Sequence, residues 1–505
     1  MTAGGATEFD VVEATVGGIH AAMRGGAVTS RALVEEYLAR IEQFDAGGPQ
    51  INSIVTVNPA AIEDAERCDR NFTQSGELAG PLHGIPVVVK DQVETAGLAT
   101  AFGCIAFKDY IPARDAPIVR RLKAAGAVIL AKSSLSDFAT SWHGISSRSG
   151  LTSNPYNPSF DPGGSSSGSG AAVAASFAAV GIAEDTGGSV RVPASFNNLV
   201  GVRPTTGLVS RTGISPLVWW QDTAGPVART VRDAAILLDV LVGYDPDDPL
   251  TAAVAGSPGI GGYAANLRVG GLQGIRLGVL RDVFGDSGSA AGSDVNAVVD
   301  AAIDELAGIG AEVVDVAVPG FASLLDETAL YFTSSHSDMN RFLEARPDAP
   351  LHSIDEVCAT GQVHPLNSFL PAIAATPLVT DDDPAYLRKV VARGRFQRAM
   401  LGAALAGRLD AFVFPTVRIP PPSRAEVLDP SSSLNTTMFP TNTEMAARAA
   451  LPAVSAPAGF TAGGLPIGLE FVGRPYGEVA LLNIALAFET ACGHRRAPVL
   501  RGPDR

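Results

Sequence analysis

Two short segments rich in serine and glycine, together with one lysine, are the parts of this chain best suited to covalent chemistry. The segments are PGGSSSGSG at residues 162–170 and DTGGSVR at residues 185–191. Serine hydroxyls can serve as nucleophiles, and glycines let consecutive backbone N–H groups converge on one oxygen. Lys90 closes the apolar run GIPVVVK. Its amine is either exposed at a strand end or buried, with a pKa low enough for it to act as a base.

The first segment has three other interpretations. One is a flexible linker, although the helix-forming residues 171–175 follow it directly. Another is a phosphate-binding loop, but no lysine follows the glycines in the pattern GxxxxGK[ST]. The third is the GxSxG nucleophile elbow of α/β-hydrolase-like esterases, with Ser166 as the nucleophile and an acid and a histidine downstream. Four histidines lie downstream without a recognisable motif: His336, His352, His364 and His494.

Taken together, these segments resemble the amidase signature family of serine hydrolases. The resemblance covers most of the chain and rests on the stretches GIPVVVKD, GGSSSGSGAAVAA, EDTGGSVRVPASFNNLVGVRPTTGLVSRTG, QDTAGPVART and GLPIGLEFVGRP. Matched residue by residue, it implies a catalytic Lys90, a cis-peptide Ser165 and a nucleophilic Ser189. The two serines are 24 residues apart, which agrees with the family pattern. Glu184 is a departure, because many members have a threonine there.

The chemistry that the resemblance implies is amide hydrolysis through an acyl-enzyme intermediate. Ser189 would attack the carbonyl, and Ser165 would pass its proton to neutral Lys90 and later to the departing amine. The resemblance also favours a role for Asp185 and Arg191 in supporting the loop, where a surface ion pair is the alternative. The oxyanion hole would consist of the backbone N–H groups of Thr186, Gly187, Gly188 and Ser189.

The substrate is less readable from the sequence. The chain has three tryptophans, Trp142, Trp219 and Trp220, which either pack in the core or line a substrate pocket. The stretch 154–229 most resembles peptide amidases and aryl acylamidases, so we expect an apolar acyl or aryl pocket. Carbamates would suit the same machinery, which makes urethanase activity a further expectation.

We therefore expect an amidase that acts on a small-molecule amide, anilide, peptide amide or carbamate. Three alternatives stay open: an amidotransferase A-type subunit that needs partner chains, an esterase that uses Ser166, and an inactive binding relative. The last is disfavoured because all three residues of the implied triad are present. No cofactor is expected. Neither HExxH nor clustered Cys and His ligands occur, so no metal is expected and chelators should not inhibit. Homodimer formation is left open.

The composition fits a large folded enzyme. The chain has 505 residues, 46% of them hydrophobic and 18% charged, which is ample for a buried core. A net charge of −15 disfavours binding to nucleic acid or to an anionic membrane. The longest apolar stretch, residues 171–183, is shorter than the roughly 20 residues of a membrane span. With no secretory signal at the N-terminus, we expect a cytoplasmic protein.

The elements that position these residues follow an α/β pattern. We predict helices at residues 33–41 (after the caps Thr29 and Ser30), 118–125, 133–140 and 295–306, and strands at 85–89, 128–130, 275–280 and 312–318. A variable seam spans 244–294. A helical elaboration at about 321–440, ending in a Pro-rich loop, should cover one end of a sheet. The resemblance implies a single domain over residues 1–505, with a large mixed β-sheet covered by helices on both faces.

Overall fold

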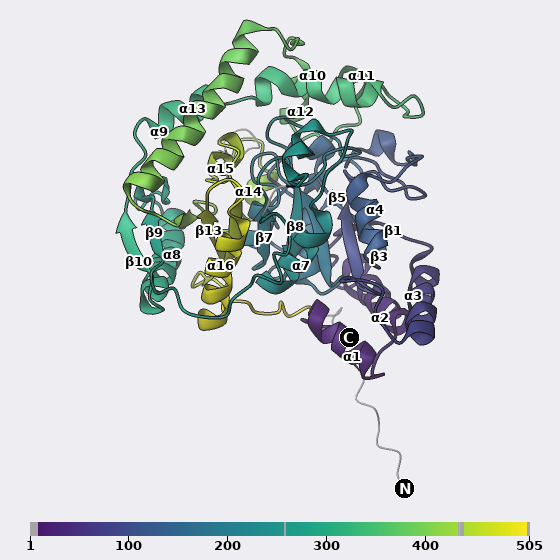
Figure 1. Ribbon diagram of the computed structural model, residues 1–505. Coiled ribbons are helices and arrows are strands. Elements are labelled where there is room, and N and C mark those ends of the chain that lie inside the picture. Colours follow the sequence, from purple (N-terminus) through teal and green to yellow (C-terminus); the bar gives the residue numbers. More distant parts are fainter. Residues whose placement is uncertain (1–8, 257–258, 433, 435–438, 502–505) are drawn as a thin grey trace.

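Short runs rich in valine, isoleucine and alanine form the strands of one large mixed sheet in the computed structural model (Figure 1). The structure describes residues 9–256, 259–432, 434 and 439–501. Across the sheet the strands are, in order, β1 (Ile54–Val57), β3 (Val128–Ser133), β2 (Pro86–Lys90), β6 (Val180–Glu184), β8 (Ala224–Ala228), β7 (Val200–Arg203), β12 (Ala453–Phe460), β13 (Pro466–Val472), β11 (Ala411–Pro415), β9 (Arg276–Val279) and β10 (Glu312–Asp315). A separate hairpin pairs β4 (Ile145–Ser146) with β5 (Gly150–Leu151).

The strand directions bring several polar residues to one edge of this sheet. Strand β2 is parallel to both β3 and β6, so the carboxyl ends of these three strands meet. Strand β8 is antiparallel to β6, with Ala224 opposite Glu184. Residues just before β8 therefore reach the same edge. This edge holds the end of the GIPVVVK run and the beginning of the DTGGSVR turn.

Helices cover both faces of the sheet, which confirms the predicted fold class. In chain order the α-helices of the described residues are α1 (Val16–Arg24), α2 (Ser30–Arg40), α3 (Ala61–Ser75), α4 (Pro117–Ala124), α5 (Ser167–Ala174), α6 (Arg191–Phe196), α7 (Val231–Leu241), α8 (Ala290–Gly308), α9 (Phe321–Glu327), α10 (Tyr331–Glu344), α11 (Ile354–Ala359), α12 (Phe369–Ala374), α13 (Pro384–Ala406), α14 (Arg424–Leu428), α15 (Glu444–Arg448) and α16 (Glu478–Cys492). Helices α5 and α6 contact each other and the central strands, and α7 contacts α4, α16 and β8. None of the helices in the described part of the chain combines the length and apolar character that a bilayer crossing requires.

Most of the predicted elements are present with small shifts of their ends. The helix predicted at 33–41 is α2, and the Thr29 hydroxyl accepts a hydrogen bond from Ala32 N at 3.1 Å, so the cap is Thr29 rather than Ser30. The strands predicted at 85–89, 275–280 and 312–318 are β2, β9 and β10, and the helices predicted at 118–125 and 295–306 are α4 and α8.

The helix predicted at residues 133–140 is wrong. Strand β3 runs on to Ser133, and only a short 3₁₀ turn, η3 (Asp137–Ala139), follows. Phe138 and Ala139 have φ angles of +47° and +61°, and an α-helix cannot contain this left-handed conformation. The turn redirects the chain across the carboxyl edge of the sheet.

The predicted helical elaboration contains α9 to α13. In Figure 1, α10, α11, α12 and α13 lie together at the top of the view, beyond the strands. Tyr331 of α10 and Phe369 of α12 belong to an apolar cluster that also contains Phe102, Phe138 and Trp142 from the first third of the chain. The elaboration thus packs onto the segment that follows β3. The extent of the single domain stays a prediction.

Candidate active site

Lys90 is the last residue of β2, and its side chain is completely buried. Its Nζ donates to Ser165 Oγ at 2.9 Å and to the backbone oxygen of Glu184 at 3.3 Å. It also lies 3.4 Å from Glu184 Oε2. Burial lowers the pKa of the Lys90 ammonium from its usual value, and the carboxylates of Glu184, Asp185 and Asp222 oppose that shift. The lysine is therefore not an exposed strand end, and its amine is placed to exchange a proton with Ser165.

Ser165 lies just before α5, and the Gly164–Ser165 peptide bond is cis, as the family resemblance implied. Its neighbour Gly163 packs against α6, because a Cβ at Gly163 would lie 3.0 Å from Val192 Cγ1. Ser189 stands directly before that helix. Within the part of the chain that the structure describes, the Ser189 hydroxyl makes no hydrogen bond. The structure thus places Ser189 on the turn that follows β6, and it joins Ser165, but not Ser189, to Lys90 by a hydrogen bond.

Residues 185–189 form a turn whose backbone N–H groups point in two directions. The Gly188 N–H donates to Asp185 Oδ1 at 2.9 Å, which holds the turn closed. Among the described residues, the N–H groups of Thr186, Gly187 and Ser189 meet no acceptor. Three of the four amides predicted for the oxyanion hole thus have no acceptor among the described residues, and the fourth, that of Gly188, is occupied.

Both glycines of this turn are required by close contacts. Gly188 has a φ of +131°, and a Cβ there would lie 1.9 Å from Thr443 Oγ1. A Cβ at Gly187 would lie 2.0 Å from Tyr331 Oη. Thr443 Oγ1 also donates to the Gly187 carbonyl at 2.6 Å. The turn is thus fixed from outside by residues of the second half of the chain.

Asp185 is the centre of a buried charge cluster beneath the turn. Its Oδ1 lies 3.0 Å from Arg191 Nη2 and 2.7 Å from Arg203 Nη1, and all three side chains are fully buried. Burial by itself would raise the pKa of Asp185, but the two guanidinium groups outweigh it and hold that pKa well below its usual range. Arg191 also pairs with Glu470 of β13. The sequence predicts a supporting role for Asp185 and Arg191. It does not identify Arg203 and Glu470 for that role, although both lie in stretches that carry the family resemblance, because local sequence does not show which distant side chains reach the turn.

Ser189 opens onto a cavity of only about 10 Å³, room for about one water molecule. Trp142 lines this cavity and also belongs to the buried apolar cluster, so the substrate-pocket interpretation stays a prediction. Trp219 and Trp220 are not among its lining residues. The Arg211 guanidinium lies 3.7 Å from the centre of the Trp219 ring, and Trp220 Nε1 donates to Tyr386 Oη at 2.6 Å. The remaining walls are Ala139, Ser141, Leu217, Tyr331 and Phe369, which sequence analysis did not single out.

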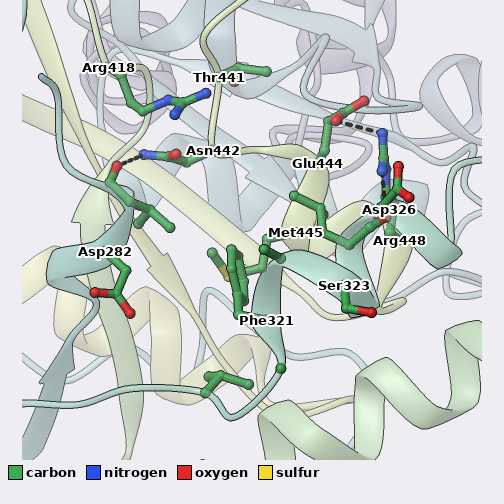
Figure 2. Close-up of a pocket in the computed structure, with 15 residues that line it drawn as sticks. Asp282, Phe321, Ser323, Asp326, Arg418, Thr441, Asn442, Glu444, Met445 and Arg448 are labelled. Carbon is green, nitrogen blue, oxygen red and sulfur yellow. Dashed lines mark hydrogen bonds and ion pairs between the residues drawn. The ribbon is translucent and has the colours of Figure 1, made fainter.

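A larger cleft, of about 740 Å³, is lined by residues of α9, α15 and the segments around them (Figure 2). Figure 2 shows Phe321 and Met445 in its wall and Glu444 paired with Arg448, at 2.7 Å. Glu444 also approaches the turn, since its Cγ would lie 3.6 Å from a Cβ on Gly187. None of Lys90, Ser165 or Ser189 lines this cleft.

The arrangement around Ser166 does not support a nucleophile elbow. The Ser166 hydroxyl exchanges hydrogen bonds with the backbone of Glu184, at 3.3 and 3.4 Å, and no strand leads directly into it. The histidine–aspartate pair downstream, His336 with Asp355, bonds instead to the Thr376 carbonyl. Ser166 therefore lacks the histidine that this mechanism requires.

Among the described residues, a single group of side chains has the composition of a metal site: Glu305, Cys492 and His494, with donor atoms within 4.8 Å of one another. These residues belong to α8 and to the end of α16. None of them contacts Lys90, Ser165 or the turn that carries Ser189.

Comparison with known proteins relates the whole chain to amide-processing proteins. A family model described as Amidase matches residues 32–482. The A-type subunit of a glutamyl-tRNA(Gln) amidotransferase from Synechococcus sp. (strain JA-2-3B'a(2-13)) is 34% identical, over 94% of this chain and 92% of the relative. A probable amidase of Arabidopsis thaliana is 32% identical, over 97% and 92%. Among solved structures, the native peptide amidase from Stenotrophomonas maltophilia has a TM-score of 0.86 and 36% identity, and the match covers 97% of this chain and 99% of that one.

Proposed function

The chain belongs to the amidase signature family, whose members act on C–N bonds, and from this premise we propose that it hydrolyses small-molecule amides through a Ser189–Ser165–Lys90 triad. The observation that carries the proposal is the buried Lys90 Nζ, 2.9 Å from Ser165 Oγ, at the edge of the sheet where the Ser189 turn begins. A buried amine bonded to a serine hydroxyl is the arrangement that a proton relay requires.

The proposed acylation step moves one proton along this line. Ser189 Oγ forms a bond to the amide carbon while its proton passes to Ser165 and the Ser165 proton passes to the Lys90 amine. The carbonyl electron pair becomes the oxyanion, which the N–H groups of Thr186, Gly187 and Ser189 stabilise. The C–N bond then breaks as the proton returns from Lys90, through Ser165, to the leaving nitrogen. Water releases the acid from the acyl-enzyme by the same relay.

This mechanism requires a Ser189–Ser165 hydrogen bond that forms once substrate is bound. Catalytic hydrogen bonds are often long before substrate binds and shorten in the Michaelis complex. The cavity beside Ser189 must also widen to admit a substrate, because about 10 Å³ holds no acyl group. Its aromatic walls, Trp142, Tyr331 and Phe369, favour an apolar or aryl acyl group.

The names of the relatives support two candidate functions. The likeness to a peptide amidase favours a peptide amide, and the aromatic cavity also suits anilides and carbamates. The likeness to A-type amidotransferase subunits supports the second candidate, a chain that works only with partner chains. We propose the stand-alone cytoplasmic hydrolase, alone or as a homodimer, because all the residues of the proposed turn and relay belong to one chain.

A turnover screen tests both candidates with the purified chain alone. The panel is benzamide, 4-nitroacetanilide, a C-terminally amidated dipeptide, phenyl acetate and ethyl carbamate, each with wild type, Ser189→Ala and Ser166→Ala. We expect amide turnover that Ser189→Ala abolishes and Ser166→Ala largely keeps. The reverse pattern would falsify the Ser189 assignment and restore Ser166 as the nucleophile. A chain that is folded yet inactive on every amide until partner subunits are added would favour the amidotransferase candidate.

A further inference from the structure

Glu184 is the carboxyl group nearest to the catalytic lysine, and the proposed relay does not use it. It ends β6, which pairs with β2, and its side chain is 1% exposed. Its Oε2 lies 3.4 Å from Lys90 Nζ. A buried carboxylate without a partner is costly, so this residue must either share a proton or pair with a cation.

The contacts around Lys90 Nζ match the needs of an ammonium group. An ammonium has three hydrogens, and three oxygens surround this nitrogen: Ser165 Oγ at 2.9 Å, Glu184 O at 3.3 Å and Glu184 Oε2 at 3.4 Å. Two of the three come from Glu184. Lys90 is an ammonium once it has taken the relayed proton, so all three contacts are used in that state.

The other oxygen of Glu184 can keep a proton when the lysine is neutral. Thr186 Oγ1 lies 2.6 Å from Asp222 Oδ1 and 3.2 Å from Glu184 Oε1. Thr186 has one hydroxyl hydrogen, and the shorter contact assigns it to Asp222. The threonine oxygen is then free to accept a hydrogen from protonated Glu184. The site therefore accommodates both the ionised and the protonated carboxyl.

From this geometry we propose that Glu184 is a positioning residue for Lys90, which stabilises the ammonium formed in the relay and so sets the pH range over which the relay works. The proposal rests on the triad proposed above. In the resting enzyme the buried pair holds one shared proton. Loss of that proton leaves the amine neutral beside a carboxylate, and this state accepts the proton from Ser165 without creating a net charge.

The other charged groups facing the pair are accounted for in the structure. Asp185 is paired with Arg191 and Arg203, and Asp222 accepts hydrogen bonds from Thr186 and from the N–H groups of Leu217 and Val218. Burial raises the pKa of the Glu184 carboxyl, and Lys90 opposes this shift. Glu184 is thus the carboxyl group whose negative charge is in direct contact with the Lys90 amine.

The test is the pH profile of kcat/KM for Glu184→Gln, on the amide of the panel that wild type turns over fastest. Removing the carboxylate leaves the ammonium with less stabilisation. We expect the acid limb to move to lower pH by about one unit or more, and the plateau rate to fall about tenfold because the lysine is a weaker base. Glu184→Asp keeps the charge and should leave the limb within about half a unit of wild type.

Glu489→Gln is the matched control, because Glu489 is another carboxyl of raised pKa whose side chain bonds Val231 N, away from the triad. Its limb should match wild type. A Glu184→Gln enzyme that is slower at every pH with an unmoved limb, or whose limb moves to higher pH, overturns the proposal. Glu184→Thr provides a second charge-removing variant if the glutamine variant fails to fold. Ser189→Ala separates the two ideas, since activity that survives it refutes the triad and leaves no relay for Glu184 to tune.

Discussion

At the scale of single residues, burial gives Lys90 its chemistry. A lysine in water keeps its proton up to a pKa of about 10.4 and cannot accept another near neutral pH. Complete burial at the end of β2 disfavours the charged form, while Ser165 and Glu184 supply acceptors once the charge is formed. The same side chain can therefore be neutral before the proton transfer and charged after it.

Replacement of Lys90 should separate amide from ester hydrolysis. Lys90→Met removes the group that protonates the leaving nitrogen, and we expect the rate on 4-nitroacetanilide to fall about 10³-fold, within the range of general acid–base effects. An ester should lose much less, because an alkoxide leaves with less help than an amine. The measurement is kcat/KM for both substrates in wild type and variant. Equal losses would remove Lys90 from the leaving-group step, and unchanged amide turnover would remove it from the mechanism.

At the scale of elements, the turn before α6 is a rigid part made by several segments. Asp185 bonds the Gly188 N–H, two arginines hold Asp185, and Thr443 bonds the Gly187 carbonyl. Breaking a buried ion pair by removing one partner typically costs about 3–5 kcal/mol. The amides proposed as the oxyanion hole are thus held in place by the folded core.

A Cβ added to Gly187 should strongly lower kcat, because it would collide with the Tyr331 hydroxyl. The Gly187→Ala Cβ would lie 2.0 Å from Tyr331 Oη, so either the turn or the tyrosine must move. We expect kcat to fall at least about 100-fold, the typical effect of losing one oxyanion donor. In the double variant Gly187→Ala/Tyr331→Phe the hydroxyl is gone, and the nearest ring atom, Cζ, lies 3.2 Å from the new Cβ. We expect kcat of this double variant to be about tenfold higher than that of Gly187→Ala.

Gly402→Ala is the control for this pair, because a Cβ at that position in α13 meets nothing within 4 Å. It should keep full activity and gain up to about 1 kcal/mol of stability. Melting temperatures of wild type, Gly187→Ala, the double variant and Gly402→Ala show whether lost activity reflects unfolding. A Gly187→Ala enzyme with wild-type kcat would mean that the turn is not the oxyanion site.

At the scale of the whole molecule, several carboxyl groups are buried, and burial favours their protonated form. Burial raises the pKa of Glu489 to about 7 and that of Asp233 to about 6. Glu489, on α16, accepts from Val231 N at the start of α7, and Asp233, on α7, accepts from Val16 N at the start of α1. Their unfolded values are near 4.5 and 3.8. Stability that depends on these protons is complete below pH 4 and is lost as pH rises toward 7.

Thermal stability should accordingly fall between pH 5.5 and pH 8. In this window the unfolded chain has already released both protons, whereas the folded chain releases them only as the pH passes about 6 for Asp233 and about 7 for Glu489, so rising pH favours unfolding. We expect about 1–3 kcal/mol from Glu489, and Glu489→Gln should narrow the difference in Tm between the two pH values. Asp185 does not reverse this trend, because its pKa lies below the window. A Tm that rises toward pH 8 would contradict the assignment.

The sequence by itself determined the chemistry-bearing residues and most of the regular elements. Strand β2, helix α2 and the Ala-rich second half of α5 follow from local patterns of residues, because neighbours along the chain dictate them. The motifs around Lys90, Ser165 and Ser189 are equally local, and the family resemblance rested on them. The helix predicted at 133–140 failed because the left-handed Phe138 and Ala139 follow from packing rather than from their own preferences.

Only the tertiary structure decided which distant residues complete the site. Tyr331 and Phe369 come from the helical elaboration, and Arg203 and Glu470 come from strands β7 and β13. Arg203 and Glu470 stand in stretches that carried the family resemblance, but no local pattern shows which residues contact the turn, since contact across the fold depends on strand order and helix packing. Glu184 is the intermediate case: the sequence showed an unusual residue beside the turn, and the parallel pairing of β2 with β6 placed its carboxyl on Lys90. A motif supplies the reacting groups, whereas their environment, and with it their pKa values and access, is a property of the folded chain.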